Sequence, residues 1–267
     1  LYSKNEPPGD NGRILKAELE ALTRVHFPPP YVHVNQPVRG LISPHIDFSR
    51  GGPVYAKTWT DSLHSARAAK LVILLGTDHF SEGLPFSLTT QNYATPHGVL
   101  PTAKDLVNQL GEIIGEETAT TGEIHHRTEH SLEFAAIWLH HTRKGKSVSL
   151  LPILCGPLES YEDDSGSLQS SPKLNAIIEY LRALVQSRPT LVVAAGDLSH
   201  VGPAFGGKQV TTSELTQLRK TDNLLLDTIV EGDAQKFYQS IRQAGNQNNV
   251  CGLSPIYLAM RILEPVD

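Results

Sequence analysis

Three short apolar segments, each followed within five residues by a His and an Asp, constrain the fold of this chain most strongly. They are residues 38–42 before His45, residues 71–75 before His79, and residues 190–195 before His200. The run at residues 71–75 is uninterrupted, which is typical of a strand that is covered on both faces, as in parallel sheets. A fourth run, residues 148–154, ends at Cys155 and Gly156. The pattern therefore predicts a central, mostly parallel sheet.

The carboxyl ends of parallel strands lie on one edge of a sheet, and open α/β folds bind their ligands at that edge. We therefore expect His45, His79 and His200 to converge there. Neutral imidazoles gathered in a cleft, with carboxylates behind them, make a site for a transition metal.

Helical patterns separate the expected strands. Helices are expected over residues 11–25, 60–70, 102–114, 212–230 and 234–244, after His130, and from the pairs Ser171–Pro172 and Ser254–Pro255. Alternating strands and helices predict an α/β fold whose sheet is flanked by helices. Without a linker or an internal repeat, residues 1–267 are expected to form a single domain. Gly51 and Gly52 suggest a tight turn, and Thr102 is the expected N-cap of its helix.

Composition limits the classes of partner. The chain has 267 residues, 39% of them apolar, and a formal net charge of -5, which argues against an obligate nucleic-acid partner. No apolar run approaches the roughly 20 residues of a membrane helix. Two cysteines do not make a disulfide framework, which favours a reducing compartment, so cytoplasm is the expected location. The sequence begins at Leu1, and we expect the natural start to lie upstream.

His45 and His79 are the first candidate metal ligands because of their place at strand ends. Asp47 and Asp78 are candidate second-layer partners of those imidazoles, although either could instead cap a surface turn. Cys251 lies between a polar loop and a helix start, where the helix dipole favours the thiolate, so it is a candidate ligand or reactive thiol. Cys155, at the end of an apolar run, is expected in the core.

His200 has two possible roles: a third imidazole ligand, or a general base held near the metal by Asp197. The sequence leaves both open. In the cluster His125, His126 and His130, His130 lies nearest the apolar face of the following helix and is the best candidate to point inward.

Three familiar motifs are absent. Residues 202–208 match GxxxxGK, but Gln209 stands where a phosphate-binding loop needs Ser or Thr. His126 and His130 are four residues apart, yet no Glu follows His126, so this is not a zinc-protease motif. Ser199 lacks the GxSxG context of a hydrolase nucleophile.

Six motifs, in order over nearly the whole chain, resemble the Memo family, which includes the component B proteins of the AmmeMemoRadiSam system. They are SPHIDFSRGG from Ser43, GTDHF from Gly76, HRTEHSLEF from His126, LPILCG from Leu151, AAGDLSHVGP from Ala194 and NNVCGLSPIY from Asn248. The resemblance implies a Memo-like fold related to class III extradiol dioxygenases, in which two His and one Glu hold Fe(II). By this resemblance, His45 and His79 correspond to the two His ligands and Cys251 to the third ligand position.

The resemblance also places His200 at the dioxygenase acid/base position and His130 in the pocket, and we take both, with Asp197, as candidate catalytic residues. Cys in place of Glu is a departure, since a soft thiolate favours Cu(I) or Zn or alters the redox behaviour of iron. Asp47 stands where many relatives have Gly.

The leading hypothesis is a redox or oxygenase-like metalloprotein with Fe(II) or Cu on His45, His79 and Cys251, acting on a small molecule. The resemblance implies an AMMECR1-like protein and a radical SAM enzyme as partners. A non-catalytic binding protein of the Memo type, holding a peptide or metal in the cleft, is the first alternative. A hydrolase using zinc-bound water is the second.

Overall fold

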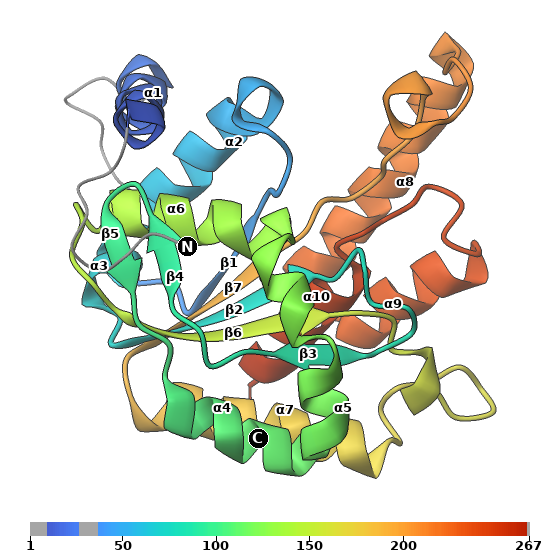
Figure 1. Cartoon of the computed structure of the whole chain (residues 1–267). Coiled ribbons are helices and arrows are strands. Elements are labelled where there is room, and N and C mark those ends of the chain that lie inside the picture. The colour runs from blue at the N-terminus through green and yellow to red at the C-terminus, as the bar shows by residue number, and fades with distance from the viewer. Residues whose placement is uncertain (1–9, 27–36, 266–267) are drawn as a thin grey trace.

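The computed structural model describes residues 10–26 and 37–265. Its core is a five-stranded sheet in the order β1-β7-β2-β6-β3 (Figure 1). The strands are β1 (Gly40–Ser43), β2 (Leu71–Thr77), β3 (Phe86–Leu88), β6 (Ser149–Cys155) and β7 (Thr190–Ala195). All neighbouring strands pair in parallel except β3, which pairs antiparallel with β6 at one edge. The predicted α/β fold with a mostly parallel sheet is confirmed.

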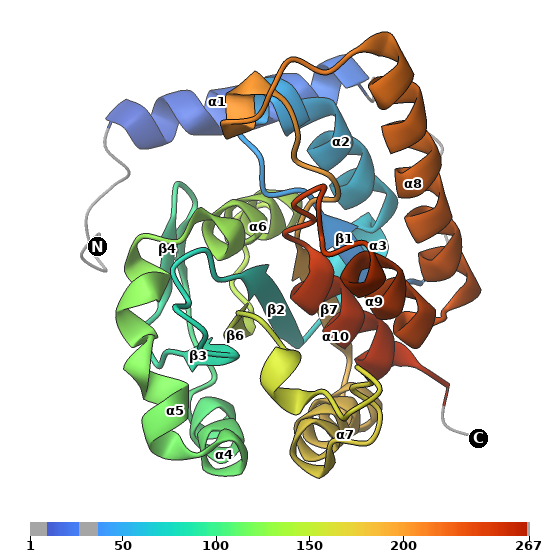
Figure 2. The same ribbon diagram turned by 90° about the vertical axis from the view of Figure 1, so that its right-hand side faces the viewer.

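Helices cover both faces of the sheet (Figures 1 and 2). One face carries α1 (Asp10–His26), α2 (Phe48–Asp61), α3 (Leu63–Ala68) and α6 (His130–Thr142). The other carries α4 (Lys104–Ile114), α7 (Pro172–Ser187) and α10 (Leu253–Leu263). The remaining helices are α5 (Glu116–Thr121), which packs on β3, and α8 (Thr212–Glu231) and α9 (Ala234–Gln243), which lie to one side of the sheet. A hairpin of β4 (Tyr93–Thr95) and β5 (Gly98–Leu100) borders α6. No helix within the described residues is both long and apolar enough to span a membrane.

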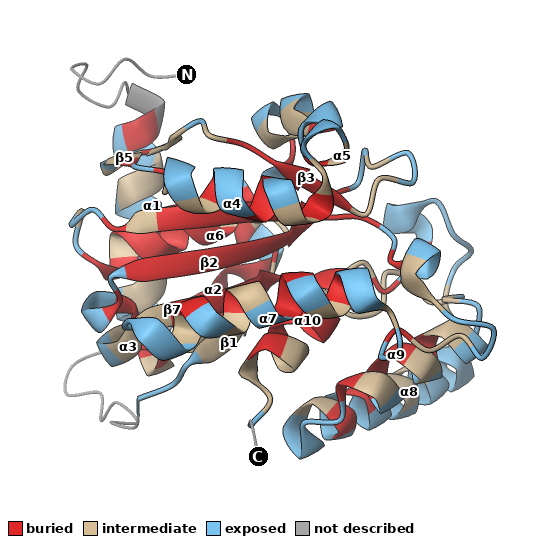
Figure 3. Cartoon of the chain, turned by 90° about the horizontal axis from the view of Figure 1, so that it is seen from below, coloured by how far each residue is buried: buried red, intermediate tan, exposed pale blue. Residues whose placement is uncertain are grey.

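Strand β2 divides the core in two. Leu71, Ile73 and Leu75 join a cluster with α4, α7 and α10, while Val72 and Leu74 join one with α2 and α6. Successive side chains of a strand point to opposite faces, so both faces of an uninterrupted apolar run are buried. Figure 3 shows the strands as a buried layer between half-exposed helices.

Three local predictions were wrong. Gly51 and Gly52 lie inside α2 and not in a turn. Their neighbours leave no room for a larger side chain: a Cβ on Gly51 would come 2.6 Å from the Ile46 side chain, and one on Gly52 would come 2.8 Å from Leu22. These glycines permit close packing of the helix. The helix expected at residues 60–70 is the end of α2 followed by the short α3.

Thr102 is also not the N-cap of α4. Its hydroxyl donates to the Gln91 carbonyl at 2.5 Å, and the residue forms a β-bridge with Leu150. The helix begins later, at Lys104, after Ala103. Tertiary pairing therefore displaced the local capping preference.

His126 links a 3-10 helix (Glu123–Arg127) to the edge strand of the sheet by hydrogen bonds, and its burial leads to a prediction about stability in acid. Its Nε2–H donates to the Ser87 carbonyl at 2.9 Å, and the Tyr93 hydroxyl lies 2.7 Å from Nδ1. Burial lowers the pKa of His126 from 6.5 to about 4. Above pH 6.5 the ring is neutral in both states. As the pH falls from 6.5 towards 4, His126 binds a proton in the unfolded chain but not in the folded chain. The free energy of unfolding therefore decreases.

The decline attributable to His126 should total about 3 kcal/mol. Urea unfolding of wild type and His126→Gln between pH 7.5 and 4 would measure it, with His64→Gln on the exposed side of α3 as the control. Equal pH slopes in wild type and His126→Gln would refute the assignment.

Candidate metal centre

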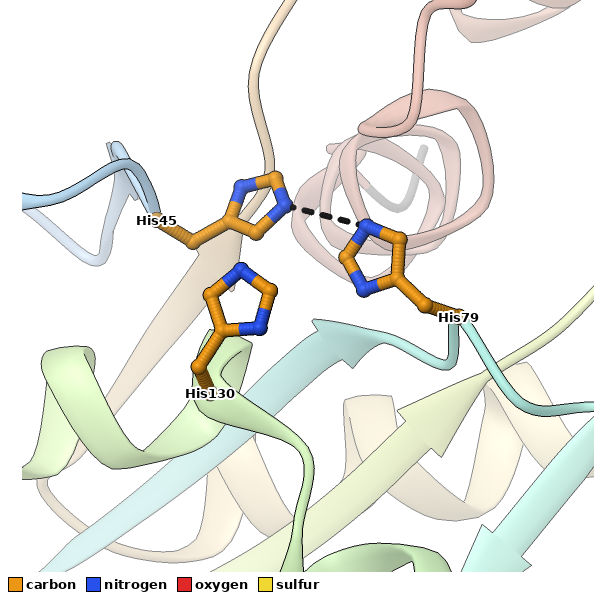
Figure 4. A group of neighbouring side chains, drawn as sticks. All are labelled: His45, His79 and His130. Carbon is orange, nitrogen blue, oxygen red and sulfur yellow. Dashed lines mark hydrogen bonds between the residues drawn. The ribbon is translucent and has the colours of Figure 1, made fainter. Parts of the chain in front are cut away.

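Three imidazoles from three separate elements meet above the carboxyl edge of the sheet. His45 follows β1, His79 follows β2, and His130 begins α6 (Figure 4). Their ring centroids are 5.1 to 5.3 Å apart. One nitrogen from each ring lies within 4.8 Å of the others, so this group could hold a metal ion.

The pair His45 and His79 is the tightest part of the cluster. Their Nε2 atoms are 3.4 Å apart, a distance at which at most one proton can lie between the two nitrogens. His45 is 2% exposed, whereas the side chains of His79 and His130 are 36% and 46% exposed. The cluster is therefore buried at His45 and open to solvent at His79 and His130.

Cys251 lies beside this cluster. Its Sγ is 3.4 Å from His45 Nε2 and 3.8 Å from His200 Nδ1. Two hydrogen bonds hold its loop: Thr77 Oγ1 donates to the Cys251 carbonyl at 2.8 Å, and the Gly252 N–H donates to the Asp197 carbonyl at 2.9 Å. Burial opposes ionisation of Cys251, but hydrogen bonds from His200, His45 and His79 outweigh it and lower the pKa to about 5. The thiolate, which is the metal-binding form, is therefore favoured at neutral pH.

Asp197 supports His45 as well as His200. Its Oδ2 lies 3.3 Å from His45 Nδ1 and 3.6 Å from His200 Nε2, and its Oδ1 accepts from the His45 backbone N–H. The His200 Nδ1–H donates to the Leu198 carbonyl at 2.9 Å. The contact with Asp197, followed by that with Cys251, raises the pKa of His200 to about 10. The rings of His200 and His45 are 6.1 Å apart, so His200 adjoins the three-histidine group.

The other sequence candidates lie further from the cluster. Asp47 caps α2 and pairs with Arg50, so the capping alternative describes the contacts of its side chain. Asp78 Oδ2 accepts from the Ser87 hydroxyl and lies 3.0 Å from His125 Nδ1, which places it against His125 and not against the ring of His79. Cys155 is 1% exposed in the core, as expected.

Glu129 is the residue that sequence reasoning missed. Its carboxylate, with a side chain 0% exposed, lies 3.0 Å from His79 Nδ1 and 3.2 Å from His130 Nδ1. It also accepts from the backbone N–H groups of His79 and Ser131. Burial alone would raise the pKa of Glu129, but these hydrogen bonds outweigh it and hold the pKa at about 2. A fully buried carboxylate behind two imidazoles is the arrangement that orients His ligands in metal sites.

The only trace of this role in the sequence is the adjacency of Glu129 to His130. The contact with His79 spans fifty positions and depends on how α6 docks on the sheet. There, the Ser131 hydroxyl donates to the Thr77 carbonyl at 2.8 Å and fixes the start of α6 against the end of β2.

Glu129→Gln is therefore expected to weaken metal binding by about 10- to 100-fold while the fold is retained. The amide preserves the shape of the side chain but removes the charge that holds the N–H of His79 and His130. Competition of the purified protein with a chromophoric Zn²⁺ chelator measures the affinity. Glu133→Gln, four residues further along α6, is the matched control. An unchanged affinity in Glu129→Gln would exclude the orienting role.

Comparison with known proteins shows which family the chain belongs to. A family model described as "Memo-like protein" matches residues 9–267. A MEMO1 family protein of Archaeoglobus fulgidus is 26% identical over 93% of this chain and 83% of its own length. One from Methanococcoides burtonii is 25% identical over 84% of this chain and 73% of its own length. One from Thermus thermophilus is 28% identical over 88% of this chain and 64% of its own length. Because the family model spans nearly every residue, the chain belongs to the Memo-like protein family.

Proposed function

We propose that this chain is a metal-dependent redox protein that holds Fe(II) or Cu at His45, His79 and Cys251 and acts on a small molecule. One observation carries the proposal: a buried imidazole lies 3.4 Å from a second imidazole nitrogen and 3.4 Å from a thiol sulfur. His130 borders the same space. Imidazole and thiolate together are a donor set for copper, zinc or iron and not for magnesium or calcium.

The carboxylates behind the donors support the same assignment. Asp197 lies next to His45 Nδ1, and Glu129 next to His79 Nδ1. In both rings a carboxylate therefore contacts Nδ1, so the proton is favoured there and Nε2 is left as the ligand. A bound iron or copper ion would supply one-electron chemistry that the protein side chains lack.

His200 is the proposed proton-transfer group. Its Nδ1–H is fixed by the Leu198 carbonyl, so the proton that can move is the one on Nε2, next to Asp197. A cavity of about 530 Å³ borders His200, Phe205 and Asn248, which offers room for a small substrate. Asp197 would stabilise the imidazolium while His200 gives or takes a proton.

The thiolate keeps a second candidate open. A soft sulfur ligand favours Zn²⁺ or Cu(I), which would suit a zinc hydrolase or a non-catalytic binding protein better than an oxygenase. For either chemistry, we propose that the protein works in the cytoplasm together with an AMMECR1-like protein and a radical SAM enzyme.

The test is anaerobic purification without chelator, metal analysis, and measurement of O2 consumption with catechol-like substrates. We expect about one iron or copper per chain and turnover that falls at least about a hundredfold in His200→Ala, with the metal retained. The matched control is His64→Ala, which changes an exposed imidazole on α3. Tight zinc without O2 uptake would reject the redox proposal in favour of the second candidate.

A further inference from the structure

The loop between α9 and α10, residues 244–252, is hydrogen-bonded to the segment that carries His200. Two backbone bonds join them: the His200 N–H donates to the Asn248 carbonyl at 2.7 Å, and the Gly252 N–H donates to the Asp197 carbonyl at 2.9 Å. The two segments therefore run antiparallel to each other. Because the loop also carries Cys251, these bonds fix the position of the proposed proton-transfer group relative to the proposed sulfur ligand.

Asn249 adds a side-chain bond to this pairing. Its Nδ2 donates to the His200 carbonyl at 3.2 Å. The main chain of His200 is thus held at both of its polar groups, its N–H by the Asn248 carbonyl and its carbonyl by the Asn249 amide. A side chain without an N–H donor at position 249 could not make the second bond.

The backbone of the loop explains why this donor is an Asn. Asn249 has a φ of 50° and Asn246 a φ of 47°, a left-handed conformation that Asn adopts more readily than most residues other than Gly. The Asn246 side chain is used inside the loop, because its Oδ1 accepts from the Val250 N–H at 2.8 Å. Asn249 instead directs its amide at the neighbouring segment. Gly could adopt the same φ but would offer no donor.

The position of the His200 main chain determines what its ring can reach. The ring Nδ1–H donates to the Leu198 carbonyl at 2.9 Å, and Nδ1 lies 3.8 Å from Cys251 Sγ. On the other side of the ring, Nε2 lies 3.6 Å from Asp197 Oδ2. A shift of the His200 main chain would change these three distances together.

We infer that Asn249 is a positioning residue for His200, whose imidazole it holds between Cys251 and Asp197 through the hydrogen bond to the His200 carbonyl. This inference rests on the proposed function, because the proton-transfer role of His200 belongs to it. Asn249 acts through His200 and takes no part in the proton transfer itself.

Nuclear magnetic resonance of the metal-free full chain tests the inference without any turnover. The ring N–H signals of His200 are assigned by their loss in His200→Gln, and their exchange with solvent is measured in wild type and in Asn249→Gly. Gly keeps the left-handed backbone and removes the amide. We expect the ring N–H of His200 to shift and to exchange about fivefold faster, the effect of losing one ordinary hydrogen bond.

The matched control is Gln247→Gly, which removes an exposed carboxamide from the same loop and adds the same backbone freedom. Its His200 ring signals should match those of wild type, and circular dichroism checks that each variant is folded. Ring signals unchanged in Asn249→Gly, or moved equally in Gln247→Gly, would overturn the inference. So would faster exchange confined to the backbone N–H of His200, because the bond would then serve only the loop. Wild type without turnover would reject the proposed function, whereas the ring signals decide the role of Asn249 separately.

Discussion

Replacing both His45 and His79 with alanine is expected to abolish high-affinity metal binding. The two Nε2 atoms are 3.4 Å apart, and each ring has a carboxylate next to its other nitrogen, so no other pair of donors in the cluster is as well supported. Removal of two ligands should weaken binding by at least about a thousandfold. Metal content after chelator-free purification and Zn²⁺ competition titrations measure the loss.

The matched control for the double variant is His64→Ala, which removes an exposed imidazole. It should keep the metal content of wild type. Because His45 is almost fully buried, the double variant must also be shown to be folded by circular dichroism. A folded double variant with undiminished metal would place the metal elsewhere.

Gly196→Ala is expected to disturb the site through the backbone. A Cβ at this position would lie 2.5 Å from the Cα of Gly252, closer than real Cβ contacts allow, so one of the two segments must move. Gly252 follows Cys251, and Gly196 precedes Asp197. The substitution therefore pushes the thiol loop away from the strand end that positions it. Overpacking of this kind typically costs about 1–3 kcal/mol of stability.

The reaction of Cys251 with a thiol reagent reports this displacement, because the other cysteine, Cys155, is buried. In Gly196→Ala the Cys251 thiol should react with the reagent faster than in wild type. The metal affinity should fall by about tenfold, and the melting temperature should drop by several degrees. Gly111→Ala on α4 is the control, since its Cβ would meet nothing closer than 3.9 Å. If Gly196→Ala behaves like Gly111→Ala, the close approach does not position the thiol.

The strand ends were predictable because β2 and β7 are apolar on both faces, and the parallel pairing of β1 with β7 and of β7 with β2 brings the residues that follow these strands to one edge. That reasoning predicted the meeting of His45 and His79. The place of Cys251 rested on the family resemblance and on the helix start that follows it. Its 3.4 Å approach to His45 depends on the Gly196 and Gly252 backbones, which no periodic pattern encodes.

The remaining parts of the site depend on tertiary packing. Glu129 could not be assigned from its own neighbourhood, because its main partner is His79, fifty residues earlier. The paired glycines of α2 suggested a turn, but their small size instead allows close packing against Ile46 and Leu22. These tertiary contacts cannot be seen in the sequence around the glycines. His130, expected as an inward-pointing pocket residue and a catalytic candidate and not as a ligand, lies in the three-histidine group because the start of α6 is bonded to the end of β2.

X-ray absorption spectroscopy at the edge of the metal that copurifies with the protein tests the central claim most directly. The claim is that imidazoles from separate strand ends and one thiolate share a single ion. We predict a first shell that contains two or three imidazole nitrogens and one sulfur at about 2.3 Å, with the sulfur lost in Cys251→Ser. A shell of oxygen and nitrogen alone, unchanged in Cys251→Ser, would contradict it.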